Sequence, residues 1–147
     1  MRPLHTGSHR ISCLLSLLAA CCLAAGAQAA PTATKSGKWS ASATWADGAV
    51  PAPGSVVTIA AGTTVELDVS PPALNGLSID GKLTFADKTD LTLTTEWIML
   101  HGELQIGTAS RPHTRNATIT LTDNVKGEDV MGGMGDRGIM ISGGTLN

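Results

Sequence analysis

Residues 77–85 read LSIDGKLTF, and residues 98–106 read IMLHGELQI. In both stretches, apolar and polar residues alternate with a period of two, the alternation breaks at a glycine, and it then resumes. This period is typical of a strand with one buried face, and glycine lets the backbone turn sharply. Each stretch therefore predicts two short strands joined by a tight turn.

The same unit recurs along the chain. Its first strands are Val57-Thr58-Ile59, Leu77-Ser78-Ile79, Ile98-Met99-Leu100, Ile119-Thr120-Leu121 and Ile139-Met140-Ile141, whose last members advance by 20, 21, 21 and 20. A glycine follows most of them, at Gly62, Gly81, Gly102 and Gly143, and Asp123-Asn124 take that place in the fourth unit. A second strand then follows, as in 64–67, 83–85 and 104–106.

A fixed period of roughly 20 residues, with two strands and a turn per unit, is typical of a stacked solenoid. The predicted fold is therefore all-β, a parallel β-solenoid or β-helix-like stack of about five rungs of 20–21 residues. The alternative is an antiparallel β-sandwich, which also has short strands at nearly regular spacing.

Residues 1–29 differ from the rest of the chain. Arg2 and Arg10 precede an almost wholly apolar run at 11–25, and Ala27-Gln28-Ala29 supplies small residues two apart. This pattern predicts a signal peptide at 1–29, because the run is shorter than the roughly 20 residues that span a bilayer. We expect a linker at 30–38 and one domain at 39–147.

The signal segment holds all three cysteines, and one of them offers a second processing route. Cleavage after Ala29 would give a secreted protein, whereas Leu18-Ala19-Ala20-Cys21 resembles a bacterial lipobox, in which Cys21 would be lipidated and kept at the cell surface. Both routes stay open. The domain itself contains no cysteine, so a disulfide framework or a cysteine metal site is excluded there.

The charge of the chain excludes one class of partner. Without Arg2 and Arg10, eight Lys and Arg face twelve Asp and Glu. An acidic surface does not attract polyanions, so nucleic acid is not expected as a partner. Contact with a membrane is expected only through a lipid anchor.

The densest polar cluster lies at 128–138. It resembles a phosphate loop only in its glycines, because no Gly-Lys-Ser/Thr follows. Its carboxylates and guanidinium could hydrogen-bond sugar hydroxyls or act as an acid and base pair. The alternative is a solvated Asp136–Arg137 pair that shapes the loop. The candidate ligand-binding residues in this loop are Glu128, Asp129, Asp136 and Arg137.

Two tryptophans stand near the first rung. We predict that Trp39 or Trp45 covers the open end of the core, next to an entry loop at 45–54. The alternative is that Trp45 is a stacking platform for a sugar, so it is also a candidate ligand-binding residue.

Other common site chemistries have weaker signals. His101 and His113 are far apart in the sequence and lack cysteine partners, and no Asp-x-Asp-x-Asp run is present, so no metal or other cofactor is predicted. With no Gly-x-Ser-x-Gly motif and no cysteine nucleophile, the sequence offers no candidate for acyl transfer.

One stretch carries a family resemblance. Residues 95–107, together with 45–58, 116–121 and 143–146, resemble the G-eight domain, an extracellular all-β module named for its glycines. The similarity covers about 37–147. The matching glycines, which we expect to be structural, are Gly48, Gly54, Gly62, Gly81, Gly102, Gly107, Gly143 and Gly144.

This resemblance implies an extracellular role in binding polysaccharide, with hyaluronan as the ligand class. It transfers no catalytic residue. The alternatives are a purely structural or adhesive surface domain and the first part of a polysaccharide-degrading β-helix enzyme. Because Asn147 follows the start of a second strand, we also expect an open sheet edge there and a longer protein.

Overall fold

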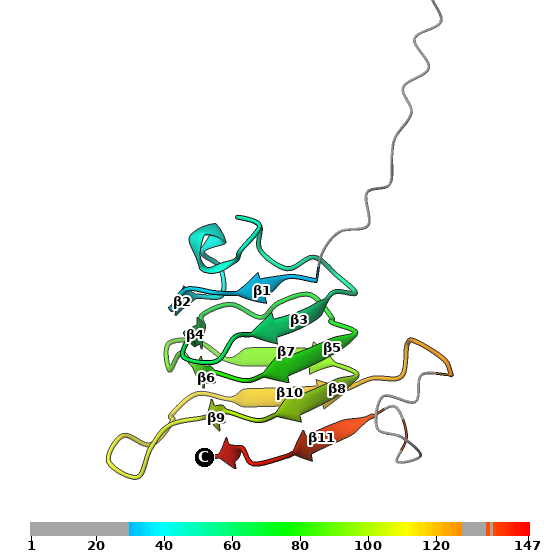
Figure 1. The fold of residues 1–147 in the computed structure, drawn as a ribbon. Coiled ribbons are helices and arrows are strands. Elements are labelled where there is room, and N and C mark those ends of the chain that lie inside the picture. Colours follow the sequence, from blue (N-terminus) through cyan, green and yellow to red (C-terminus); the bar gives the residue numbers. More distant parts are fainter. Residues whose placement is uncertain (1–29, 128–134, 136) are drawn as a thin grey trace, which may run out of the picture.

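The computed structural model describes residues 30–127, 135 and 137–147, which form three sheets of short strands (Figure 1). Sheet A contains β1 (Thr32–Ala33), β3 (Val56–Ile59), β5 (Gly76–Ile79), β8 (Trp97–Leu100) and β11 (Gly138–Ile141). Sheet B contains β2 (Gly37–Lys38), β4 (Thr64–Leu67), β6 (Lys82–Phe85), β9 (Glu103–Gln105) and β12 (Thr145–Leu146). Sheet C pairs β7 (Leu91–Thr95) with β10 (Ala117–Leu121).

The chain winds from sheet A to sheet B, later also through sheet C, and then returns to sheet A one rung further along. Each strand pairs in parallel with the strand of the next rung, as β3 does with β5 and β4 with β6. The predicted parallel β-solenoid is therefore confirmed, and the pairing excludes the antiparallel sandwich.

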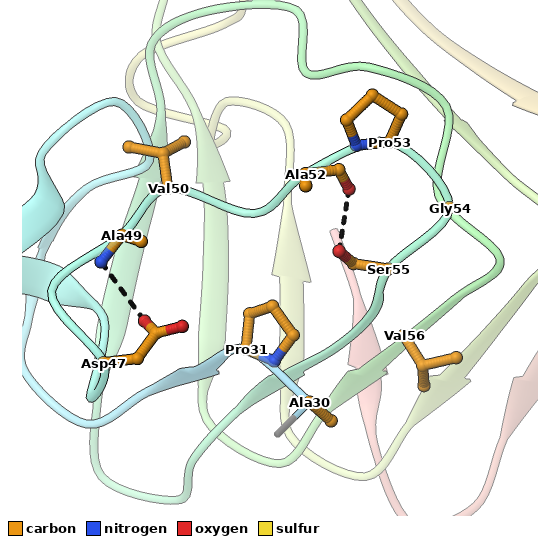
Figure 2. Close-up of a pocket in the computed structure, with 10 residues that line it drawn as sticks. All are labelled: Ala30, Pro31, Asp47, Ala49, Val50, Ala52, Pro53, Gly54, Ser55 and Val56. Carbon is orange, nitrogen blue, oxygen red and sulfur yellow. Dashed lines mark hydrogen bonds between the residues drawn. The ribbon is translucent and has the colours of Figure 1, made fainter. Parts of the chain in front are cut away.

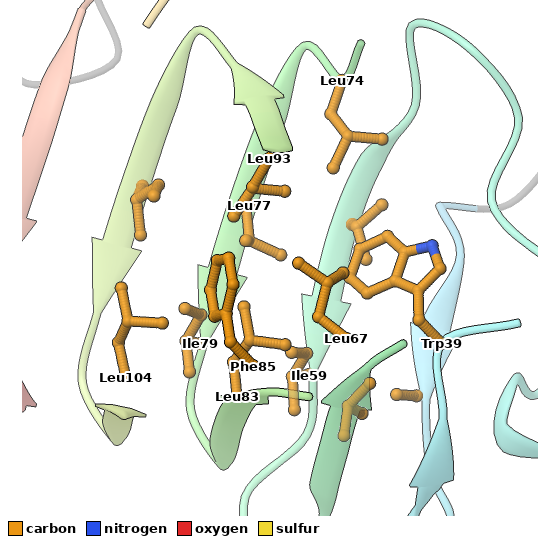
Figure 3. Packing of buried hydrophobic residues seen from close by; sticks show 14 of the residues in the cluster. Trp39, Ile59, Leu67, Leu74, Leu77, Ile79, Leu83, Phe85, Leu93 and Leu104 are labelled. Atoms are coloured by element: carbon orange, nitrogen blue, oxygen red, sulfur yellow. The ribbon is translucent and has the colours of Figure 1, made fainter. Parts of the chain in front are cut away.

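Aliphatic side chains stack into one core inside the solenoid. The registers place Ile59 beside Ile79 and Ile79 beside Leu100 in sheet A. Sheet B repeats the arrangement, and Figure 3 shows leucines and isoleucines of successive rungs facing the same interior. These inward positions are almost fully buried because alternate residues of a strand point to opposite faces.

The fourth unit of the repeat was placed wrongly. Ile119-Thr120-Leu121 belongs to β10 and pairs with β7 in sheet C, so Ile139 pairs directly with Ile98. That rung is consequently about twice as long as predicted, and Asp123-Asn124 do not lie at the turn between sheets A and B. A period-two pattern suits any half-buried face, so the spacing alone did not identify the sheet.

The segment 30–38, expected to be a linker, is partly built into the solenoid. Thr32 and Ala33 pair with β3, and Gly37 and Lys38 pair with β4, so this segment adds a strand to each of two sheets. Ala33 is fully buried. The strands are only two residues long, which is too short for a period-two pattern to show in the sequence.

Both tryptophans at the N-terminal end cover the core, as predicted for at least one of them. Trp39 is fully buried and Trp45 is 3% exposed, their rings meet edge to face with centroids 4.9 Å apart, and Trp45 Nε1 donates to the Trp39 carbonyl at 2.9 Å. The 3-10 helix η1 (Ser42–Thr44) lies between them. Trp45 is therefore not available as an exposed platform for a sugar, and that prediction was wrong.

The eight matching glycines serve two structural needs. Five of them, Gly48, Gly54, Gly62, Gly107 and Gly143, have φ between 70° and 79°, a conformation that disfavours other residues. The other three, Gly81, Gly102 and Gly144, pack against the preceding rung: a Cβ on Gly102 would lie 1.9 Å from the Gly81 carbonyl oxygen. All eight positions thus have a backbone reason for glycine.

The C-terminal end of the stack differs from the capped N-terminal end. By register Ile139, Ile141 and Leu146 occupy inward positions, yet they are 38%, 50% and 51% exposed.

In the part of the chain described, no helix has the length and hydropathy to span a membrane.

Candidate functional site

The outer face of sheet B carries a column of polar side chains. The registers align Glu66 with Thr84 and Thr84 with Gln105. Their neighbours Val65, Leu83 and Leu104 are fully buried, so the residues between them point outward. Three successive rungs thereby present a carboxylate, a hydroxyl and an amide on one face.

A loop at 106–116 forms a wall beside this column and is drawn in yellow in Figure 1. It turns tightly, because Thr108 N donates to the Arg111 carbonyl at 2.9 Å and Arg111 N donates to the Thr108 carbonyl at 3.1 Å. Gly107, at φ 79°, permits the sharp departure from β9. Gly107 also leaves room for His113, because a Cβ on residue 107 would lie only 2.5 Å from the backbone nitrogen of His113.

Two carboxylates hold the return segment of this loop in place. Asp87 accepts hydrogen bonds from Thr114 N and Arg115 N at 2.9 Å, and also from the Thr114 hydroxyl. Asp90 accepts from Asn116 N at 3.0 Å. The wall position is therefore set by side chains of the preceding rung.

Between the column and the wall lies a hollow of about 260 Å³, which we call the sheet B groove. Its polar lining consists of Glu66, Thr84, Asp87, Gln105, Thr108, Arg111 and His113. A second hollow of about 570 Å³ lies against the same loop, lined by Ile106, Ala109 and Pro112 among others. The groove is the more polar of the two.

Several groups in the groove lack a partner. Within the described residues, the Glu66 carboxylate, the Gln105 amide and the Arg111 guanidinium make no hydrogen bond or ion pair. Asp87 is different, because the backbone N–H of Thr114 is the main cause that lowers the pKa of its carboxyl below 3.8. The groove thus offers both acceptors and donors to a ligand.

His113 forms part of the groove lining and is itself packed tightly. Its side chain is 7% exposed, and Nδ1 lies 3.7 Å from Asp87 Oδ1. A carboxylate on this side favours the tautomer with hydrogen on Nδ1. Nε2 is buried and has no hydrogen-bond partner in the described part of the chain.

The predicted ligand-binding residues are not brought together at this groove. Glu128, Asp129 and Asp136 lie outside the described residues. Arg137 precedes β11 of sheet A, and its guanidinium lies 3.7 Å from Asp123 Oδ2. Trp45 is buried at the N-terminal end.

The two histidines considered as metal ligands lie at separate places. His101 Nδ1 is 2.8 Å from Asp80 Oδ1 at a turn between sheets A and B, whereas His113 faces Asp87. Among residues 30–127, 135 and 137–147, no three His, Cys, Asp or Glu side chains converge as a metal site would require.

A further hollow of about 380 Å³ lies beside the entry loop, and Figure 2 shows its lining. Pro31, Val50 and Pro53 make much of this lining apolar. Asp47 accepts from Ala49 N at 3.2 Å, and the Ser55 hydroxyl donates to the Ala52 carbonyl at 2.7 Å. Because these polar groups already have partners, this hollow offers a ligand less than the sheet B groove does.

The groove was missed at the sequence level, although part of its signal was present. Aligning the second strands of the repeat places Glu66, Thr84 and Gln105 at equivalent outward positions. Arg111 and His113 carry no such signal, because the path of a loop does not follow from the strand period.

Comparison with known proteins identifies the family of this chain. The model of the G8 domain matches residues 44–147. Human fibrocystin-L is 36% identical over 94 residues, which are 63% of this chain and 2% of fibrocystin-L. Fibrocystin-L of Mus musculus is 34% identical over 94 residues, with the same shares. The chain thus spans only a small part of these relatives.

No solved structure matches this chain significantly. The family model, however, covers well over half of the chain. It includes every strand of sheets A and B from β3 onward, together with both strands of sheet C. The chain belongs to the G8 domain family.

Proposed function

We propose that this chain is an exported, extracellular or cell-surface module that binds glycan in the sheet B groove. One observation carries the proposal: the Glu66 carboxylate, Gln105 amide and Arg111 guanidinium, which have no partner among the described residues, line one hollow. Sugar hydroxyls both donate and accept hydrogen bonds, so a mixed set of this kind suits them.

The volume of the groove limits the size of the ligand that it can bind. A hollow of about 260 Å³ is small compared with the pockets of drug-sized ligands and suits one sugar unit of a longer chain. Arg111 can bind a uronate carboxylate, while Glu66 can accept from hydroxyls. An acidic polysaccharide of the hyaluronan class is therefore the first ligand to test. Because the overall charge of the domain does not attract a polyanion, the local pairing with Arg111 has to supply the electrostatic attraction.

Calorimetric titration of the 30–147 protein against a glycan panel, hyaluronan included, tests the proposal. Arg111→Ala is expected to weaken binding about tenfold or more, because a hydrogen bond to a charged group contributes about 1.5–3 kcal/mol. Arg115→Ala is the matched control, since Arg115 lies in the same loop but does not line the groove. Flat isotherms at millimolar ligand, or equal losses in both variants, would refute binding in this groove.

Export has a separate test. Mass spectrometry of the mature N-terminus distinguishes cleavage after Ala29 from a diacylglyceryl group on Cys21. An intact N-terminus on protein recovered from the producing cell would contradict both processing routes.

A further inference from the structure

The turn between sheets A and B carries a column of three polar side chains. Ile79, Leu100 and Ile141 are in register in sheet A, so the next residues, Asp80, His101 and Ser142, follow one another at the turn. The same backbone hydrogen bond repeats in each rung: His101 N donates to the Ile79 carbonyl and Ser142 N to the Leu100 carbonyl, both at 3.0 Å. Adjacent rungs are separated by about 4.8 Å.

A hydrogen bond between Asp80 and His101 orients the imidazole. His101 Nδ1 lies 2.8 Å from Asp80 Oδ1, and a carboxylate there favours hydrogen on Nδ1. Nε2 then keeps its lone pair and can act as a base. Asp80 precedes His101 by one rung and Ser142 follows it by one rung, so the histidine stands between the other two.

The column is open to solvent. The side chains of His101 and Asp80 are 46% and 38% exposed, and Ser142 is exposed as well. A serine, a histidine and an aspartate supplied by three rungs are the three side-chain types of a nucleophile, its base and the group that orients the base.

The turn that follows Ser142 has one residue more than the two turns before it. In those turns, Gly81 N donates to the Ile59 carbonyl and Gly102 N to the Ile79 carbonyl. Among the described residues, the N–H groups of Gly143 and Gly144 have no such acceptor. Two backbone donors next to a serine can stabilise an oxyanion.

We propose that Ser142, His101 and Asp80 form a hydrolytic site for carboxylic esters, with the N–H groups of Gly143 and Gly144 as oxyanion donors. Ser142 lies in no Gly-x-Ser-x-Gly motif, so the sequence alone offered no candidate for acyl transfer, and the three residues are aligned only by the strand registers. The Ser142 hydroxyl oxygen bonds to the ester carbonyl carbon while its proton moves to His101 Nε2. The C–O bond then breaks, and this proton leaves with the alcohol. Water, deprotonated by Nε2, next attacks the acyl-serine, which releases the acid and returns the proton to Ser142.

The openness of the column indicates the substrate class. A pendant ester, such as an O-acetyl group on a larger molecule, can reach three exposed side chains without entering a deep cavity. The site is on a different part of the solenoid from the sheet B groove and does not depend on glycan binding there.

The test treats the full chain with a fluorophosphonate, which phosphonylates activated serines, and with p-nitrophenyl acetate. We expect the adduct on Ser142, located by peptide mass spectrometry, with the other serines of the chain as internal controls. Ser142→Ala should abolish labelling, and His101→Gln should slow it about a hundredfold or more, as expected for loss of a general base. Arg115→Ala, which lies outside both the column and the lining of the groove, should label at the wild-type rate.

A rescue experiment separates a chemical role from a structural one. His101→Ala should regain part of the labelling rate when imidazole is added, while circular dichroism shows an unchanged sheet content. An unlabelled Ser142 in the wild-type protein, or equal rates for wild-type and His101→Gln, would overturn the proposed site.

Discussion

At the scale of single residues, Glu96 connects two consecutive corners of the solenoid. It lies between β7 and β8, is fully buried, and its Oε1 accepts from Asn124 N and Val125 N, both at 2.7 Å. Its Oε2 has no partner in the described residues. The side chain thus holds the segment that follows β10 against the preceding rung.

Glu96→Ala should lower the free energy of unfolding by about 2–4 kcal/mol, because it leaves two backbone donors without their acceptor. Glu96→Gln keeps a carbonyl oxygen and should lose less. Urea unfolding of both variants measures the difference. Glu66→Ala is the control, since the Glu66 carboxylate has no partner within the described part of the chain and its loss should change stability by less than about 0.5 kcal/mol. Equal losses in the Ala and Gln variants would show that Oε1 does not hold the corner.

Gly102 and Gly48 need glycine for different reasons, Gly102 because there is no space for a side chain and Gly48 because of its backbone conformation. A Cβ on Gly102 would meet two backbone oxygens, at 1.9 Å from Gly81 and 2.6 Å from Asp80, whereas a Cβ on Gly48 would have nothing within 4 Å. Gly48 instead has φ 70°. Gly102→Ala should therefore cost at least about 3 kcal/mol, and Gly48→Ala only about 1–2 kcal/mol. Thermal unfolding of both variants gives the comparison, and a similar loss in the two would contradict the close packing of this turn.

At the scale of elements, the repeat predicted sheets A and B correctly because their inward pairs, such as Leu77 with Ile79, keep one spacing. It failed at 119–121, since the same alternation suits the third face equally well. The signal that could have prevented the error is the period-two segment at 91–95, which lies between two assigned strands and has no place in a two-strand rung.

The sheet B groove shows a second limit of what the strand repeat can predict. Its column follows from strand register, and so was accessible from sequence. Its wall depends on hydrogen bonds from 114–116 to Asp87 and Asp90, which join segments that are distant in the sequence. No local pattern encodes such contacts, so the sequence alone does not place this loop.

The wall of the groove should detach in acid. Backbone hydrogen bonds from Thr114 and Asn116 are the main causes that lower the pKa of Asp87 and Asp90 below 3.8. A lowered folded-state pKa means that the anchoring is fully present above 3.8 and is lost as the pH falls through the folded-state values. In NMR spectra, the amides of Thr114, Arg115 and Asn116 should shift together below pH 3.8, before core amides such as that of Ile98. Movement already at neutral pH, or only with global unfolding, would contradict this.

At the scale of the whole molecule, the first and last rungs of the described solenoid differ in how far their inward residues are covered. Trp39 and Trp45 cover the first rung, whereas Ile141 and Leu146 hold inward positions and are about half exposed. Inward aliphatic residues and unpaired strand edges at the same end favour association with other polypeptide. Because the N-terminal end is covered, head-to-tail stacking of copies has no matching surface, so self-association should involve two C-terminal ends.

The exposed last rung should therefore govern the solution behaviour of residues 30–147. The 30–147 protein is expected to self-associate as its concentration rises, and the double variant Ile141→Lys, Leu146→Lys should remain monomeric, because charges at a strand edge oppose pairing and apolar contact. Sedimentation velocity over a range of concentrations measures this. Val50→Lys is the control, since Val50 is 39% exposed but lies in the entry loop, away from the last rung. A wild-type protein that stays monomeric, or a Val50→Lys variant that dissociates equally well, would show that the uncovered rung does not drive association.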